Sequence, residues 1–310
     1  MSFLQVLAQL APDASEVNDL SMGGFSTAME NPATMLGIIL LAVMGLLGAV
    51  VQKRLMSVMN KYSEMEAPVS GAETARRMLE QNGIRDVRVV STKGKLTDHY
   101  NPADKTVNLS EVVYKCNSVT AMAVAAHECG HAVQHATSYP WLRLRSSIVP
   151  MVNIGSRLGQ VVFIAGLALV GANGNTIVAW VGLALFACTS IFAFVTLPVE
   201  FNASRRALKW LEESGIANGA MHDHAQTALK WAAMTYVSAA LSSLAQLVYY
   251  AGLIFSRASS RRCFHIPVAP CRMSPRTPTR QRSQNCGSAP ACWRWSSPPC
   301  APASVMCPPV

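Results

Sequence analysis

Charged residues are scarce in this chain: Asp, Glu, Lys and Arg make up 14% of its 310 residues, while 51% are hydrophobic. Soluble globular domains carry about 25% charged residues. The composition therefore argues against an ordinary soluble enzyme and indicates a membrane protein.

The main body of the chain also lacks a basic surplus and paired cysteines. The net charge is +9, but residues 256–310 contain eight arginines and no acidic residue, which leaves +1 for the residues before them. We therefore expect no nucleic-acid partner. Cys116, Cys129 and Cys188 are scattered without the spacing of a disulfide framework, and the other six cysteines lie in 256–310. The main body needs no disulfides, which fits a reducing compartment.

The N-terminus lacks the charge layout of a signal peptide. Residues 1–34 form an acidic segment without lysine or arginine, and the uncharged run 35–52 that follows ends next to Lys53 and Arg54. A signal peptide has basic residues before its apolar stretch. The run therefore predicts an uncleaved transmembrane helix, and the positive-inside rule assigns the residues after it to the cytoplasm.

Three further apolar runs predict transmembrane helices. Residues 148–199 predict a hairpin of two helices with a break at 171–175, and residues 231–255 predict a fourth span. Basic residues of the connecting parts lie on the side already assigned to the cytoplasm, namely Arg143, Arg145, Arg205, Arg206, Lys209 and Lys230. We therefore expect a multi-pass protein of the inner (plasma) membrane whose polar parts, 53–147 and 200–230, face the cytoplasm.

The last segment, 256–310, differs from the rest. It holds ten of the seventeen prolines and shows no apolar periodicity. Such a composition predicts a disordered, basic, Pro- and Cys-rich tail. The tail either binds nucleic acid or anionic lipid, or is a non-native reading-frame extension. We favour the second interpretation, because the helix count would put this basic segment outside the cell, against the positive-inside tendency.

The stretch from His127 to His131 has the residues of a metal site. It reads His-Glu-Cys-Gly-His within an alanine-rich segment that favours helix, and Asn117 or Ser118 can cap the start of that helix. Histidines four residues apart lie on one face and can bind one ion, and Glu128 is positioned to reach a water on that ion. The alternative is a pair of exposed histidines on an ordinary helix.

A small sheet is expected before this helix. Ser70 and Glu73 form a capping box that predicts a helix to about residue 82, with Gly83 as its stop. Short strands are predicted at 86–91, 95–100 and 105–110. In zinc proteases whose two histidines lie on one helix beside a sheet, an edge strand of the sheet pairs with the substrate backbone. We expect Thr106–Leu109 to be that edge strand, or else a strand with a purely structural role.

A catalytic zinc needs a third protein ligand and one open position. The metzincin pattern fails because Gln134 and Thr137 occupy its Gly and His positions. His135 is one further helical step on, and the rotation of about 40° per four residues carries it off the ion. Glu200, which directly follows an apolar run, is the favoured candidate. His222 and His224 remain alternatives, and Arg205 or Arg206 could pair with Glu200 instead.

Several motifs in one order resemble a known family. They are Lys61-Tyr-Ser63, Gly94-Lys-Leu-Thr-Asp-His-Tyr100, Val124-Ala-Ala-His-Glu-Cys-Gly-His-Ala-Val-Gln134, Arg145-Ser-Ser-Ile-Val-Pro150 and Thr196-Leu-Pro-Val-Glu-Phe-Asn-Ala-Ser-Arg-Arg-Ala207. Residues 35–255 resemble the YugP-type neutral zinc metallopeptidases of bacterial membranes. The resemblance implies an α-helical membrane protein with a small α+β zincin-like (gluzincin-type) catalytic domain. It also implies Zn²⁺ held by His127, His131 and Glu200, with Glu128 as the catalytic residue. Related HtpX-like and prenyl-protein peptidases have an aspartate four residues after the third ligand, where this chain has Ser204.

The expected activity is hydrolysis of peptide bonds by zinc-activated water with Glu128 as general base. The substrate would be a peptide or a membrane protein, and the lipid bilayer is the other expected partner. Candidates for stabilising the developing oxyanion are His99, Tyr100, Tyr236 and Arg205. The alternative function is a scaffold or interaction module with a structural zinc site, in which a fourth ligand such as His222 or His224 closes the coordination.

Overall fold

The fold is mostly helical with one small sheet. The computed structural model describes residues 32–94 and 96–263. Its elements are α3 (Pro32–Ser63), α4 (Gly71–Gln81), β1 (Arg88–Thr92), β2 (His99–Asn101), β3 (Thr106–Ser110), α5 (Glu111–Lys115), α6 (Val119–Ala136), α7 (Pro140–Asn173), α8 (Ile177–Glu213) and α9 (Ala220–Cys263). Nearly all of the acidic segment 1–34, and the expected tail beyond residue 263, lie outside the described residues.

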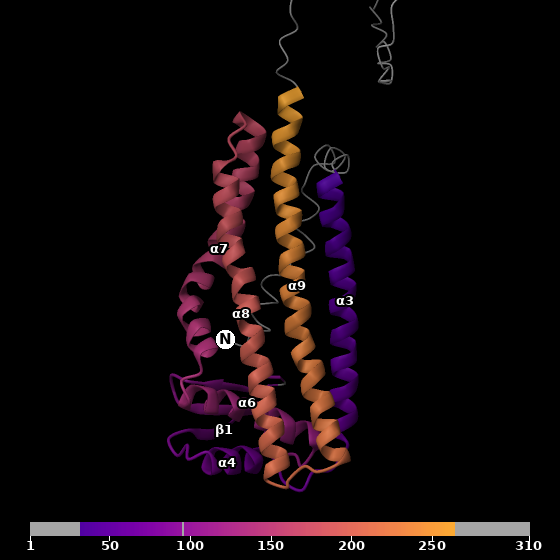
Figure 1. The fold of residues 1–310 in the computed structure, drawn as a ribbon, viewed down its shortest axis with the longest axis vertical. Helices are drawn as coiled ribbons and strands as arrows, with labels where there is room; N and C mark the ends of the chain where they lie inside the picture. The colour runs from indigo at the N-terminus through magenta and orange to yellow at the C-terminus, as the bar shows by residue number, and fades with distance from the viewer. Residues whose placement is uncertain (1–31, 95, 264–310) are drawn as a thin grey trace, which may run out of the picture. The chain divides into compact units, whose positions relative to one another are not determined.

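Four helices, α3, α7, α8 and α9, are long and apolar enough to cross a membrane (Figure 1). They contain the four predicted apolar runs. In a bilayer the backbone must satisfy its own hydrogen bonds, which a continuous helix does. At 1.5 Å per residue, the 37 residues of α8 extend about 56 Å, well beyond the roughly 30 Å of a hydrocarbon core. The long helices therefore have ends that can project from the membrane.

The end of α9 differs from the expected boundary at residue 255. The helix continues to Cys263, and the guanidinium of Arg257 donates a hydrogen bond of 2.9 Å to the Leu167 carbonyl of α7. This contact ties the last turns of α9 to the neighbouring helix. The first residues of the expected tail are therefore helical.

Helices α7 and α8 form a closely packed hairpin. A Cβ at Gly182 would lie 2.5 Å from the Phe163 backbone, so only glycine allows the two helices this approach. Small residues at such crossings are the usual means of packing helices in membranes, where van der Waals contact drives association. The hairpin returns the chain to the end of the bundle from which α7 started (Figure 1).

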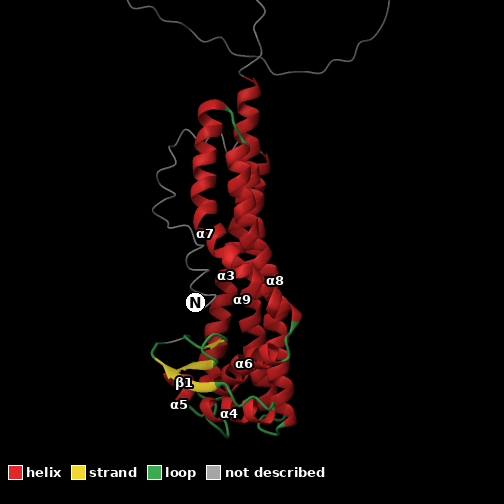
Figure 2. Ribbon diagram, turned by 90° about the vertical axis from the view of Figure 1, so that its left-hand side faces the viewer, coloured by secondary structure: helices red, strands yellow, loops and turns green. Residues whose placement is uncertain are grey.

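The three strands and helices α4, α5 and α6 form a small domain, which lies at that same end (Figure 2). Helix α4 begins as predicted, because the Ser70 hydroxyl accepts a hydrogen bond of 3.2 Å from the Glu73 amide. The helix stops at Gly83, whose φ is +72°. The predicted strands are present, although β2 is reduced to three residues.

The strand order corrects one expectation. The order is β1-β3-β2, with β3 parallel to β1 and antiparallel to β2. Thr106–Leu109 therefore lies in the central strand, and its assignment as the edge strand is wrong. Val107 and Leu109 are fully buried, because they belong to the apolar core that covers one face of this central strand. The strand next to α6 is β2, because the Tyr100 amide binds a side chain of that helix.

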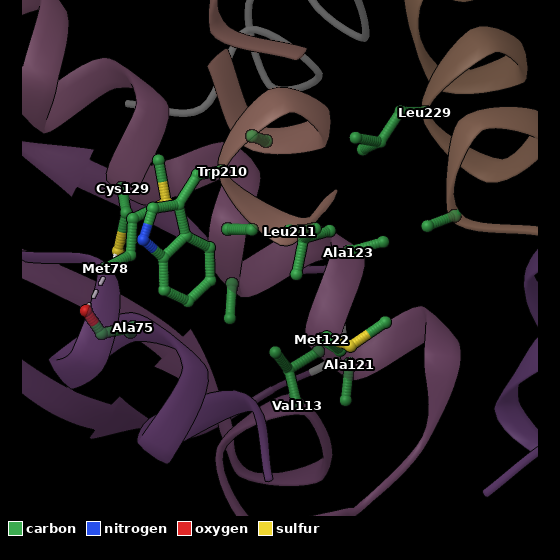
Figure 3. Packing of buried hydrophobic residues seen from close by; sticks show 14 of the residues in the cluster. Ala75, Met78, Val113, Ala121, Met122, Ala123, Cys129, Trp210, Leu211 and Leu229 are labelled. Atoms are coloured by element: carbon green, nitrogen blue, oxygen red, sulfur yellow. Dashed lines mark hydrogen bonds between the residues drawn. The ribbon is translucent and has the colours of Figure 1, made fainter. Parts of the chain in front are cut away.

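The core of the small domain includes residues near the ends of three long helices, α3, α8 and α9. Met78 of α4, Met122 and Cys129 of α6, and Trp210 and Leu211 of α8 pack in one cluster (Figure 3). These buried apolar side chains hold α6 against the last third of α8. The histidine helix is therefore positioned relative to residues that follow it by about seventy positions.

Candidate metal centre

Helix α6 positions the two histidines. Ser118 caps its start by accepting a hydrogen bond of 3.2 Å from the Ala121 amide, as predicted. His127 and His131 follow one turn apart on one face, with ring centroids 4.9 Å apart and ring planes at 85° to each other. The side chains are 14% and 11% exposed, so both imidazoles are largely shielded from solvent.

Glu200 of α8 completes a group of three. Its Oε2 lies 3.3 Å from His127 Nε2 and 3.6 Å from His131 Nε2, and one ligand atom from each residue lies within 4.8 Å of the others. The carboxylate is 3% exposed. Within residues 32–94 and 96–263, this is the one group of His, Cys, Asp and Glu side chains arranged to hold a metal ion.

A glycine contact brings the two helices this close. Gly130 lies between the histidines in sequence, and a Cβ placed on it would be 2.6 Å from the carbonyl oxygen of Ala203. On α8, Glu200 lies three residues before Ala203 and Ser204 directly after it, and both side chains face α6. The missing side chain at Gly130 therefore allows the carboxylate of α8 to reach the imidazoles of α6.

The donor set fits a zinc ion. Oε2 of Glu200 is buried and has no hydrogen-bond partner within the described chain, which is costly for a carboxylate oxygen unless a cation meets it. Ligands bound to zinc at about 2.0–2.1 Å in a tetrahedron lie roughly 3.3 Å apart. The spacings of 3.3 and 3.6 Å between this oxygen and the two imidazole nitrogens are close to that value.

The other nitrogen of each histidine is hydrogen-bonded. His127 Nδ1 lies 3.1 Å from the Ser204 hydroxyl, and His131 Nδ1 lies 3.1 Å from Gln134 Oε1. Such outer partners orient metal-binding imidazoles and direct Nε2 to the ion. Ser204, at the position where related peptidases have an aspartate, thus contacts one of the three grouped side chains.

Glu128 lies beside the group and is held by the sheet. Its Oε2 accepts a hydrogen bond of 2.9 Å from the Tyr100 amide of β2. The side chain is only partly exposed, and this withdrawal from water raises the pKa of Glu128 to about 7. In the segment Asp98-His99-Tyr100, Tyr100 reaches Glu128 through its backbone, whereas Asp98 binds Ser110 on β3.

The remaining histidine candidates have other contacts. His135 lies outside the metal-binding group, as the helical rotation predicted, and its Nδ1 is 3.1 Å from the Tyr100 hydroxyl. The His224 ring packs on Tyr62 with 4.7 Å between centroids, and His222 lies 4.0 Å from Asp223. None of the three belongs to the metal-binding group found in the described part of the chain.

The charged and polar neighbours of Glu200 differ from the expected ones. Arg205 is exposed and Arg206 binds Asn202 at 2.8 Å. The cation near the carboxylate is Arg145 of α7, 3.9 Å from Glu200 Oε1. Tyr236 of α9, an expected oxyanion candidate, also lies near Glu200 and Glu128. Sequence reasoning did not identify Arg145 as a site residue, although it begins one of the motifs quoted above.

Comparisons with known proteins agree with this geometry. Residues 37–255 match a family described as "Putative neutral zinc metallopeptidase". The chain is 43% identical over 201 residues to the "Putative membrane protease YugP" of Bacillus subtilis (strain 168), and the match covers 64% of this chain and 88% of that protein. No solved structure matches the chain.

The match includes the histidine helix, Glu200 and the four long helices. It spans more than two thirds of the sequence, and a zinc ion is the cofactor of the family by its description. This membrane-associated chain, with three side chains arranged to hold that ion, belongs to the neutral zinc metallopeptidase family.

Proposed function

We propose that the protein is a membrane-embedded zinc-dependent endopeptidase with a zincin-like, gluzincin-type site. His127, His131 and Glu200 are the zinc ligands, and Glu128 is the general base. The observation that carries the proposal is the buried Glu200 oxygen, which has no hydrogen-bond partner in the described chain and faces the Nε2 atoms of both histidines.

The proposed roles of the zinc ion and of Glu128 follow from the contacts of the side chains. When bound, the zinc supplies a Lewis acid that acidifies water and polarises a carbonyl. Glu128 is anchored through Oε2 to the Tyr100 amide, so its other oxygen can take a proton from the attacking water. Glu128 then delivers that proton to the leaving amine as the peptide C–N bond breaks, which releases a carboxyl group and an amine.

Three ligands rather than four favour catalysis over a structural role. A structural zinc site is closed by four protein ligands, whereas a catalytic one keeps a position open. His222 and His224, the candidates for a fourth ligand, contact Asp223 and Tyr62. These contacts favour the peptidase over a scaffold with a structural zinc.

The substrate chain is proposed to lie along the outer edge of β2. An extended peptide binds an open strand edge through its main chain, and β2 is the strand whose backbone meets Glu128. Tyr236 of α9 lies near both Glu200 and Glu128, and we favour it as the group that stabilises the oxyanion developing on the attacked carbonyl.

The site is proposed to lie on the cytoplasmic side of the inner membrane. Lys53, Arg54 and Lys61 lie in the last turns of α3, at the end of the bundle that carries the small domain (Figure 1). The positive-inside rule then assigns residues 53–147 and 200–230 to a cytoplasmic catalytic part. Glu200 lies about 35 Å along α8 from its first residue, just beyond one hydrocarbon thickness.

Exchanging Glu128 for glutamine tests the mechanism. The amide cannot accept the water's proton, while the three ligands are unchanged, so Glu128→Gln should bind zinc as the parent does and lose hydrolysis. Zinc content of the purified protein and digestion of casein or a membrane-protein substrate are the two measurements. A variant that retains activity within a few-fold of the parent would exclude Glu128 as the base.

A further inference from the structure

Gln134 is a fully buried polar side chain between the two helices of the metal centre. It lies on α6, three residues after His131, and its exposed fraction is 0%. Oε1 is 3.1 Å from His131 Nδ1. Nε2 donates to the Val199 carbonyl at 2.7 Å and to Asn202 Oδ1 at 3.0 Å. Both amide hydrogens and the oxygen therefore have partners, as a buried amide requires.

The contact with Val199 determines which way the amide points. A backbone carbonyl only accepts hydrogen bonds, so the NH₂ group of Gln134 must face it. Asn202 Oδ1 agrees with this orientation, because it also accepts from the Arg206 guanidinium at 2.8 Å. The amide oxygen of Gln134 is then the atom that faces His131.

The orientation of the amide in turn determines the tautomer of His131. Oε1 can only accept, so Nδ1 of His131 must carry the proton, and Nε2 keeps its lone pair. Nε2 is the atom 3.6 Å from Glu200 Oε2. The serine that contacts His127 Nδ1 does not act in the same way, because a hydroxyl can donate or accept.

We infer that Gln134 is a positioning residue that joins two zinc ligands through one side chain. It holds His131 as the Nδ1–H tautomer, and it binds the backbone of Val199, the residue directly before Glu200. The inference rests on the proposed metal site and adds to it the residue that prepares His131 and Glu200 for the ion before the ion arrives. A ligand that must change tautomer on binding would weaken affinity for the metal.

The first test measures zinc affinity. Gln134→Met keeps a side chain of similar length but removes the donors and the amide acceptor. Outer-sphere partners of metal-bound histidines typically account for about 10- to 100-fold in metal affinity, and we expect a loss in that range by competition with a chelating dye in detergent solution. Gln81→Met is the control. Gln81, at the end of α4, also links two helices, because its Oε1 accepts a hydrogen bond of 2.7 Å from Trp210 Nε1 of α8.

The thermal midpoint of the zinc-free protein separates positioning from general stability. Both glutamine variants should lower it, Gln134→Met by more because Gln134 is fully buried and Gln81 is exposed, while only Gln134→Met loses affinity for zinc. Affinity within twofold of the parent for Gln134→Met, or an equal loss for Gln81→Met, would overturn the inference.

A second measurement needs no change to Gln134. In zinc-free parent protein labelled with ¹⁵N-histidine, the His131 resonances, assigned by their loss in His131→Gln, should show the Nδ1–H tautomer. An Nε2–H tautomer would overturn the inference even if Gln134→Met does not fold. Failure of the proposed function looks different: the parent would then bind zinc with the His131 tautomer described here and yet hydrolyse no substrate.

Discussion

Gly130→Ala should weaken zinc binding although it changes no ligand. The added Cβ would lie 2.6 Å from the Ala203 carbonyl oxygen and 3.2 Å from the Ala203 Cα. Ordinary van der Waals contact begins at about 3.4 Å, so α8 must retreat by roughly 0.8 Å or α6 must move by that amount. Neither obstacle is a flexible side-chain end, because both atoms belong to the backbone.

The size of the effect follows from where the strain is released. Overpacking of this kind costs about 1–3 kcal/mol. The zinc-free protein can relieve it by separating α6 from α8, but the ion requires Glu200 to return to within about 0.2 Å of its place. If the whole cost of the clash is present only in the zinc-bound protein, the affinity for zinc falls by about 5- to 150-fold, at 1.4 kcal/mol for each factor of ten.

Gly171→Ala supplies the matched control for this change. Gly171 is also helical, and nothing lies within 4 Å of a Cβ placed there. Alanine in a helix stabilises the folded protein by up to about 1 kcal/mol relative to glycine. Gly171→Ala measures this gain without a clash, and the same gain offsets part of the cost of the clash in Gly130→Ala. Zinc affinity is measured by chelator competition for both variants. An affinity for Gly130→Ala equal to that of Gly171→Ala would refute the reasoning that this contact positions Glu200.

Three further outcomes are expected. Glu200→Ala should lower zinc stoichiometry as severely as His131→Ala, and Glu200→Gln should weaken it, as metal analysis of purified protein can measure; full zinc in Glu200→Ala together with loss in His222→Ala would assign the third ligand to His222, at the start of α9, instead. A topology reporter fused after residue 140 should behave as cytoplasmic, because Lys53, Arg54 and Lys61 lie in the last turns of α3 on that side; periplasmic reporter activity would reverse the orientation. Removal of residues 264–310 should leave zinc content and activity nearly unchanged, since α9 and the family match both end before them; loss of activity would show that the segment is required.

Local patterns in the sequence were enough to predict most elements. The capping serines Ser70 and Ser118 act through hydrogen bonds within one helical turn, so neighbouring residues determine them. The apolar runs predict the long helices because a membrane leaves the backbone no other partners. The spacing of His127 and His131 follows from helix geometry alone.

Tertiary structure decided how distant segments meet. The sequence allowed Glu200, His222 or His224 as the third ligand, and the structure groups Glu200 with the two histidines because α6 packs against α8, which the glycine at 130 permits. The central position of β3 also escaped prediction, because strand order depends on pairings between segments and not on the alternation within each strand.

The partners of the ligands were the least visible in the sequence. Arg145 reaches Glu200 from α7, and Gln134 reaches Val199 from α6, across 55 and 65 positions of the chain. Nothing in the local pattern around either residue specifies such a contact. The sequence by itself determined a membrane protein with a histidine helix and a short set of candidate ligands. Only the packed helices, which remove these polar groups from water and so require each to have a partner, decided which groups form the site.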